Sequence, residues 1–186
     1  MHVELHLVGV LGADSGRAAV SFLGAEPIEV LRFGPDGDGL TRYVTLGMSR
    51  APMADPGTTQ VAVDGPRAEL VLSLSEPRDG VLRSLATVAA SPVVEGLVLG
   101  PGAGLDLGEP LWEGAPFTAL LVASPGGLVP DLEVAHGEPV QFLPVLPMTP
   151  NEAAWKRVHG AAALEQRWLD HRCDLRDPRR PQVDLA

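Results

Sequence analysis

The sequence predicts an α+β fold, with a mainly antiparallel central sheet flanked by two main helices. Apolar runs of strand length follow one another through the first half of the chain, separated by short turns rich in Gly, Pro and Asp. Turns that short join antiparallel strands, because a parallel crossover needs a dozen or more residues. Two later stretches have apolar residues at helical spacing. The length suits one domain, which we expect at residues 1–170, followed by a polar C-terminal tail at 171–186.

The predicted strands are apolar or alternating runs bounded by turn residues. They lie at residues 3–7, 18–23, 28–33, 41–48, 60–63, 69–74, 96–99, 117–123 and 131–134, with a last one beginning at Val140. The run at 28–33 has apolar residues on both faces, which favours the interior of the sheet. Residues 34–39 have the composition of a hairpin turn, and residues 100–116 that of a long surface loop. For residues 171–186 we expect a frayed end or a late edge strand.

The first predicted helix covers residues 81–90. Asp79 precedes it as a candidate cap, and its apolar residues line one side. We expect the helix to stop at Ser91 and Pro92, because the residue before a proline disfavours helical geometry.

The second predicted helix begins after Thr149 and runs to Leu169. Pro150 occupies the first helical position and Glu152 lies three residues after Thr149, which is the spacing of a capping box. Trp155 and Trp168 fall on one face, so we expect this helix to cover the sheet. Glu165 lies within the same apolar stripe. We expect it to pair with an arginine, for which Arg32 and Arg42 are the candidates; the alternative is a polar spot left for a partner.

Charge and cysteine content limit the classes of function. The net charge of −10 argues against nucleic acid as a partner, because phosphates would be repelled. It serves solubility or attracts a basic protein. Cys173 is the only cysteine, so no intrachain disulfide is expected and a reducing cytoplasm is the predicted location. The N-terminus does not resemble a signal peptide, and no stretch has the length of a membrane span, so no membrane partner is expected.

Several residue groups have types suited to chemistry, but their spacing does not favour it. His2, Glu4 and His6 are metal-ligand types, yet a solvated strand face explains them better. The adjacent Asp170, His171 and Cys173 sit together at a helix end, whereas catalytic groups converge from separate elements. The Gly-rich stretch at 100–108 lacks the Lys and Ser/Thr of a phosphate loop, and Ser15 and Ser49 lack the G-x-S-x-G pattern. We therefore expect no catalytic residue, cofactor or metal.

Trp112 lies in the predicted Gly/Pro-rich loop. Tryptophan dominates many interface hot spots, so Trp112 is a candidate anchor for a protein partner. The alternative is that it folds back as a lid on the core.

Three motifs in order resemble one family. They are YVTLGMS at residues 43–49, ELVLSL at 69–74 and QFLPVLPMTPNEAAWKRVHGAAAL at 141–164. Together they resemble the suppressor of fused (SUFU) domain, in its compact bacterial form, over residues 28–169 or so. The resemblance implies a SUFU-like α+β fold with no catalytic activity. We therefore expect that the two-domain grip with which animal relatives hold a peptide does not carry over to this sequence.

The resemblance also implies a function. Bacterial relatives look like immunity proteins, so we expect a protein-binding domain that neutralises a partner toxin, for which a basic toxin domain suits the acidic charge. The alternative is a regulatory or peptide-binding module that takes an extended segment at an unpaired sheet edge near Tyr43; a hydrolase or metal enzyme is less favoured. The family's partner surface corresponds to the region of residues 41–48, which makes Tyr43 and, less directly, Asp55 candidate protein-binding residues beside Trp112. The oligomeric state is open.

Overall fold

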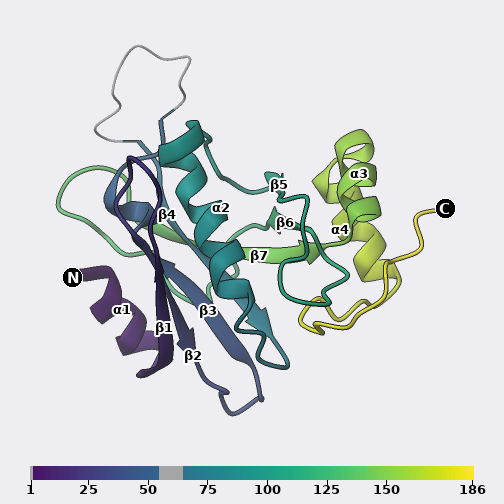
Figure 1. Ribbon diagram of the computed structural model, residues 1–186, viewed down its shortest axis with the longest axis horizontal. Coiled ribbons are helices and arrows are strands. Elements are labelled where there is room, and N and C mark those ends of the chain that lie inside the picture. Colours follow the sequence, from purple (N-terminus) through teal and green to yellow (C-terminus); the bar gives the residue numbers. More distant parts are fainter. Residues whose placement is uncertain (1, 55–64) are drawn as a thin grey trace.

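A seven-stranded sheet forms the centre of the molecule in a computed structural model that describes residues 2–54 and 65–186 (Figure 1). Its strand order is β1-β2-β3-β4-β7-β6-β5. All neighbours are antiparallel except β4 and β7, which are parallel. The strands are β1 (Asp14–Val20), β2 (Ile28–Phe33), β3 (Thr41–Leu46), β4 (Arg67–Leu74), β5 (Gly104–Asp106), β6 (Ala119–Val122) and β7 (Val140–Met148). The predicted α+β fold with a mainly antiparallel sheet is confirmed.

Helices cover the sheet at three places. They are α1 (His2–Leu11), α2 (Val81–Glu95), α3 (Pro150–His159) and α4 (Ala161–Asp170), with a short 3-10 helix, η1 (Met48–Arg50), after β3. In β2, Val30 belongs to the cluster under α2, and its neighbour Leu31 packs in the cluster that contains Leu7 of α1. Successive side chains of a strand point to opposite faces, so α1 and α2 cover opposite faces. The third cluster lies under α3 and α4.

The long strand β7 joins the two parts of the sheet. Its first half pairs with β4 and its second half pairs with β6. The strands β1–β4 and α1 therefore lie on one side of the molecule, and α3 and α4 lie on the other (Figure 1).

The predicted N-terminal strand is wrong, because residues 2–11 form α1. Leu7 is fully buried, and Val3 and Leu11 pack beside it, which is a spacing of four residues and places all three on one helix face. Leu5, which the alternating pattern placed on the buried face, is 66% exposed. The short apolar–polar alternation was therefore compatible with a helix as well.

The first predicted helix is longer than expected, because α2 continues through Pro92 to Glu95. Proline cannot donate to the carbonyl four residues earlier. The Ser91 hydroxyl donates to that carbonyl, Val88 O, at 2.8 Å, so the acceptor is satisfied. Gly96, with a positive φ of 70°, ends the helix. Residues 96–99 form no strand.

The second predicted helix is two helices, because Gly160 breaks it with φ 89° and ψ 163°. The capping box of Thr149 and Glu152 and the proline at the start of α3 are confirmed. The two tryptophans do not share one helix: Trp168 on α4 is buried, and Trp155 on α3 is half-buried against the His159 ring.

Other predicted elements differ in smaller ways. Residues 131–134 contribute only a single bridge, between Leu132 and Val140, and the loop at 100–116 contains β5. The predicted strand at 60–63 lies outside the described residues. Residues 171–186 form no strand and are not frayed, because Arg180 and Val183 within them are buried. The division into a domain and a tail at residue 170 stays a prediction.

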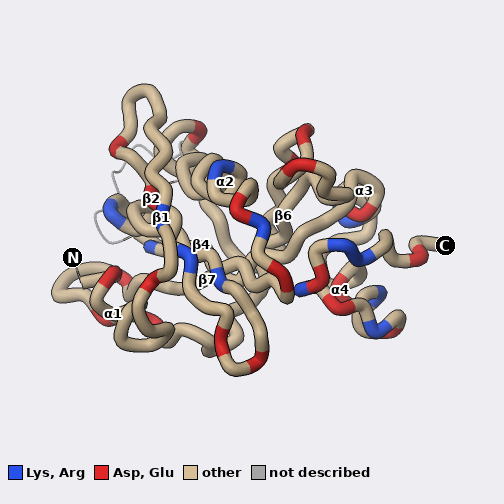
Figure 2. Tube along the Cα trace, turned by 60° about the horizontal axis from the view of Figure 1, so that its bottom comes forward, with Lys and Arg blue, Asp and Glu red and all other residues tan. Residues whose placement is uncertain are grey.

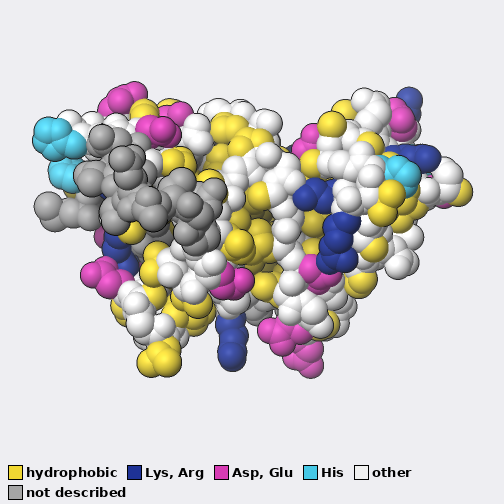
Figure 3. Space-filling view, turned by 90° about the horizontal axis from the view of Figure 1, so that it is seen from above, with side chains coloured by type: hydrophobic (Ala, Val, Ile, Leu, Met, Phe, Trp, Pro, Cys, Tyr) yellow, Lys and Arg dark blue, Asp and Glu magenta, His cyan; other side chains and the backbone are white. Residues whose placement is uncertain are grey.

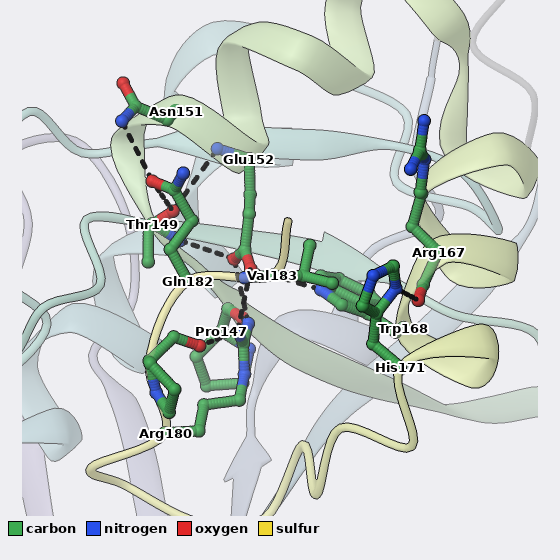
Figure 4. Close-up of polar contacts among 11 residues, drawn as sticks. Pro147, Thr149, Asn151, Glu152, Arg167, Trp168, His171, Arg180, Gln182 and Val183 are labelled. Carbon is green, nitrogen blue, oxygen red and sulfur yellow. Dashed lines mark hydrogen bonds and ion pairs between the residues drawn. The ribbon is translucent and has the colours of Figure 1, made fainter. Parts of the chain in front are cut away.

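A buried carboxylate fixes the end of β7, the start of α3 and the C-terminal segment together (Figure 4). Arg180 Nη1 and Nη2 donate to Glu152 Oε1 and Oε2 at 2.7 and 2.8 Å. Glu152 also accepts the backbone N–H of Thr149 and of Val183 and the indole N–H of Trp168. Both charged side chains are buried. A buried charge is tolerated when its partners satisfy it in this way.

Burial would raise the pKa of the Glu152 carboxyl. The hydrogen bonds and charge of Arg180, together with the hydrogen bonds that backbone N–H groups donate, outweigh burial and hold that pKa below its ordinary value.

Neither Arg32 nor Arg42 pairs with Glu165: Arg32 pairs with Asp79 and Arg42 with Asp36. The predicted ion pair of Glu165 is therefore wrong.

We expect Arg180→Ala to lower the free energy of unfolding by about 3–5 kcal/mol, because it leaves the Glu152 carboxylate buried without a counter-ion. Urea denaturation followed by tryptophan fluorescence measures the loss. The control is Arg157→Ala, which removes an ion pair with Asp106 whose Arg157 side chain is 61% exposed and should cost less than about 1 kcal/mol. Equal losses in the two variants would contradict the role given to Arg180.

Candidate interaction surface

Tyr43, the first predicted contact residue, lies inside the molecule. It is fully buried on β3, which has β2 on one side and β4 on the other. Its hydroxyl accepts the N–H of Arg78 at 2.7 Å and donates to Asp79 Oδ1 at 3.0 Å. Arg32 Nη1 then donates to Asp79 Oδ2 at 2.7 Å. Tyr43 therefore connects the sheet to the turn that precedes α2, and Asp79 serves this connection rather than a helix cap.

The burial of Tyr43 has two consequences. Burial, together with the hydrogen bond to the Asp79 carboxylate, raises the pKa of the Tyr43 phenol far above its ordinary value, so the hydroxyl stays protonated. The expected unpaired strand edge near Tyr43 is wrong, since the edges of the described sheet are β1 and β5.

A second buried carboxyl group, that of Glu69, was not among the predicted site residues. Its Oε1 accepts the N–H of Gly47 at 2.9 Å and both the N–H and the hydroxyl of Ser49, at 3.1 and 2.6 Å. Its Oε2 accepts the Thr45 hydroxyl at 2.6 Å. The motifs at residues 43–49 and 69–74 are thus one physical unit, in which the carboxyl group on β4 fixes the turn after β3.

The other two predicted contact residues are Trp112 and Asp55. Trp112 is 6% exposed, and its ring meets Phe117 edge-on with ring centroids 5.7 Å apart. Of the two alternatives, the lid on the core is therefore the one observed. Asp55 lies outside the described residues.

Several of the candidate metal and catalytic residues contact other groups in the structure. Glu4 pairs with Arg17, and the His6 ring lies 2.8 Å from Pro130 O and stacks on Phe142. Near the end of α4, Asp170 accepts from Gln166 while His171 Nδ1 lies 2.9 Å from Arg167 O. Within residues 2–54 and 65–186, no three His, Cys, Asp or Glu side chains are placed to hold a metal ion.

Acidic residues occur over most of the molecule (Figure 2), but the basic residues are unevenly distributed along the sequence. Between Arg83 and Lys156 the sequence contains no Lys or Arg but eight Asp or Glu residues. Two of the eight are engaged by cations outside the stretch, since Asp106 pairs with Arg157 and the Glu152 carboxylate is held by the C-terminal segment. The other six are exposed and form no ion pair with another described residue.

These six exposed acidic residues lie in three places. Glu95 lies at the end of α2. Glu109 and Glu113 lie on the loop before β6, which packs on the cluster under α2 and lines a hollow together with Arg83. The other three, Asp131, Glu133 and Glu138, lie on the loop after β6, which packs on the cluster beside α1, and we call them the acidic loop surface. No Lys or Arg of the same stretch offsets their charge.

The fold defines the class of the protein as an α+β domain built on a mixed seven-stranded sheet. Among the helices that the structure describes, none has the length and apolar character needed to cross a membrane. The sequence matches the family model described as "Suppressor of fused protein (SUFU)" over residues 24–181. The chain therefore belongs to the SUFU family, as its three motifs predicted.

Solved structures share the fold. A protein described as a SUFU homologue from Neisseria gonorrhoeae is 18% identical, with a TM-score of 0.71 over 100% of this chain and 96% of that one. A chain of the Sufu–Fu complex is 15% identical, with a TM-score of 0.67 over 97% and 90%. Drosophila Suppressor of Fused is 15% identical, with a TM-score of 0.66 over 98% of this chain and 50% of that one. No curated protein sequence matches the chain.

The Glu69 carboxyl leads to a pH-dependent prediction. Burial raises its pKa above the ordinary value, against the lowering effect of its hydrogen bonds. The folded protein therefore binds this proton more readily than the unfolded chain does. The contribution of Glu69 to stability is largest below the unfolded pKa and falls as the pH rises through the raised folded value.

We expect the wild-type free energy of unfolding, minus that of Glu69→Gln, to fall as the pH is raised from about 4 towards neutrality. The glutamine keeps the shape of the side chain but does not titrate. Urea denaturation of both proteins at a series of pH values measures the difference. A difference that grows with pH would contradict the raised pKa.

Proposed function

We propose that this chain is a non-catalytic protein-binding domain of the cytoplasm, of the immunity type, that neutralises a partner toxin with a basic surface. The observation that carries the proposal is the stretch between Arg83 and Lys156, which has eight acidic residues and no Lys or Arg. The exposed carboxylates on the loop after β6 form the acidic loop surface, away from any cation of their own segment. Such a surface attracts a basic protein and repels nucleic-acid phosphates.

The chemistry of this surface favours fast association. Asp131, Glu133 and Glu138 are exposed and form no ion pair with the described residues. Their charges are free to act on an approaching cation within a Debye length of about 8 Å at physiological salt. Complementary charge raises the rate of encounter more than it raises the final affinity. A neutralising protein gains directly from that, because it must meet its toxin before the toxin meets its target.

The relatives support a role in protein binding. One of the similar structures is described as the Sufu–Fu complex, so that relative binds another protein. We carry this over to the present chain as part of the proposal.

The three candidate contact residues have different parts in the proposal. Tyr43 is buried, so we propose that it acts through the turn at Arg78 and Asp79, which its hydroxyl holds. Trp112 offers only its 6% exposed edge, and we propose that it supports the loop before β6 and the two glutamates on that loop. Asp55 remains a proposed contact on the resemblance alone.

A second candidate function is the capture of an extended segment at a sheet edge. The observation that favours it is β1, which forms one edge of the described sheet. Arg17 at its centre pairs with Glu4, Asp14 and Glu29. Charge on an edge strand discourages pairing with further strands, so we place this function second.

The direct test titrates this protein into an activity assay of the purified toxin domain encoded beside its gene. We expect stoichiometric inhibition, with a 1:1 complex on size exclusion. A toxin whose activity does not change at any ratio would contradict the immunity function.

A charge-reversal variant tests the surface. We expect Asp131→Lys, Glu133→Lys and Glu138→Lys together to weaken toxin binding by about tenfold or more, mainly through a slower association rate. Surface plasmon resonance at several salt concentrations measures the rates, and the salt dependence of association should flatten.

The matched control reverses Asp38, Asp170 and Asp184, which are exposed and lie outside the acidic stretch. It changes the net charge by the same amount, so it separates the local surface from the charge of the whole molecule. Equal weakening by the two triple variants would count against the acidic loop surface, and no weakening by either would count against a basic partner.

A further inference from the structure

Glu165, which the sequence placed in an apolar stripe, faces a hollow beside α4, and we call this the α4 hollow. It has a volume of about 490 Å³, and its apolar walls come from Trp168 and Leu169 of α4, Leu146 of β7 and Leu175 of the C-terminal segment. Glu165 is half-buried there, and its side chain forms no ion pair or hydrogen bond within the described residues. A carboxylate beside apolar walls gains from a cation that meets it from outside. The α4 hollow is therefore a candidate contact site.

Arg172 lines the same hollow and has an unusual backbone conformation. Its φ of 50° is left-handed, and among the described residues no other non-glycine residue has a positive φ. It follows α4 at the position where helices favour glycine, because the Arg172 N–H donates to Leu169 O and the Cys173 N–H donates to Trp168 O. The Arg172 guanidinium forms no ion pair or hydrogen bond with another described residue. Strain at a residue whose charge is unused within the described chain points to a role at the surface.

The order of these side chains along the chain is self-complementary. Glu165 comes first, Arg172 comes seven residues later, and the apolar Trp168 and Leu169 lie between them. When two copies of a helix pack antiparallel about a two-fold axis, residue i of one meets residue j of the other, and j meets i. If Glu165 meets Arg172 of the second copy, Leu169 lies opposite the Trp168 that lines the other hollow. Leu169 is 70% exposed, so it is free to make that contact.

The geometry points to a second copy of this chain as the occupant of the α4 hollow. In this dimer the exposed Leu169 of each copy covers the hollow of the other, and each Glu165 meets an Arg172 across the two-fold axis. An apolar centre with a charged rim is the usual anatomy of an interface. A basic partner fits this hollow less well, because Arg172 lies on it, and finds a better match at the acidic loop surface. That surface lies beside α1 and stays free in the dimer, so each copy keeps its site for the proposed toxin.

The charge of this end of the molecule permits the contact. The net charge of the chain is −10, but residues 156–180 contain seven Lys or Arg and four Asp or Glu. Figure 3 shows Lys, Arg and His side chains beside hydrophobic ones on its right, at the α3 end of the molecule. The repulsion between two copies is therefore weaker here than the net charge suggests. One helix and an adjoining segment make a small contact, so we expect a dimer whose amount depends on protein concentration.

Light scattering coupled to size exclusion, repeated over a range of concentrations at physiological salt, tests the inference. We expect the mass to rise with concentration towards twice the 19.5 kDa of one chain. Leu169→Glu should weaken the dimer by about tenfold or more, because it places a carboxylate from each copy at the apolar centre. The matched control is Leu5→Glu, on α1 at the other side of the molecule, where the leucine is 66% exposed. It should leave dimerisation within about twofold of wild type.

Arg172→Gly separates a contact from a structural role. Glycine is favoured at this left-handed position, so the variant should unfold at the same urea concentration as wild type or at a higher one. It should still weaken the dimer by about tenfold, because Glu165 of the second copy loses its cation. An Arg172→Gly variant that dimerises like wild type would overturn the inference.

A charge swap tests the antiparallel order of the two copies. Glu165→Arg alone and Arg172→Glu alone should each weaken the dimer by about tenfold, because like charges then face each other. The two changes together should restore it to within about threefold of wild type. Circular dichroism checks that each variant is folded. The inference fails if the wild-type protein stays monomeric at every concentration, if the mass rises beyond two copies, or if the double variant is no better than the single ones.

Discussion

The hydrogen bonds of the Glu152 carboxylate hold the second half of the structure together. They join the N-terminus of α3, the indole of Trp168 on α4, and Arg180 and Val183 of the C-terminal segment. No one of these parts could bury its polar group alone without a cost of several kcal/mol. Arg180 also lies over the rings of Phe117 and Trp168, 4.9 and 5.3 Å from their centroids. The last residues of the chain are thus part of the fold.

Glu69 performs a similar task in the first half without a cation. Hydroxyl and backbone donors from Thr45, Gly47 and Ser49 surround it. The two carboxyls therefore respond to protons in opposite ways: burial raises the pKa of Glu69, while Arg180 helps to lower that of Glu152. As the pH falls through the lowered pKa of Glu152, its carboxylate is protonated and the stability that it contributes is lost. The raised pKa of Glu69 means that the folded protein binds this proton more readily than the unfolded chain, so Glu69 contributes most to stability at low pH. The sheet and both carboxyl clusters form a rigid support for surface loops.

Features that depend on neighbouring residues could be predicted from the sequence. The capping box of Thr149 and Glu152 is one, and the central position of β2, apolar on both faces, is another. The partner of Glu152 could not be predicted, because Arg180 lies 28 residues away. Nor could the break at Gly160, since glycine alone does not end a helix. The order of the motifs indicated the family, but not that Glu69 binds the residues of the other motif. The stretch without a cation is visible in the sequence, and it is the signal that could have located the acidic loop surface.

The most direct measurement is hydrogen exchange, by NMR, of the Trp168 indole N–H and the Val183 amide. Both donate to Glu152. If the Glu152 cluster joins the C-terminal segment to the fold, both hydrogens should exchange only through global unfolding, at the rate of the central amides of β4. Fast exchange of these two hydrogens, while the β4 amides stay protected, would show that the segment opens independently and would contradict the role given to Glu152.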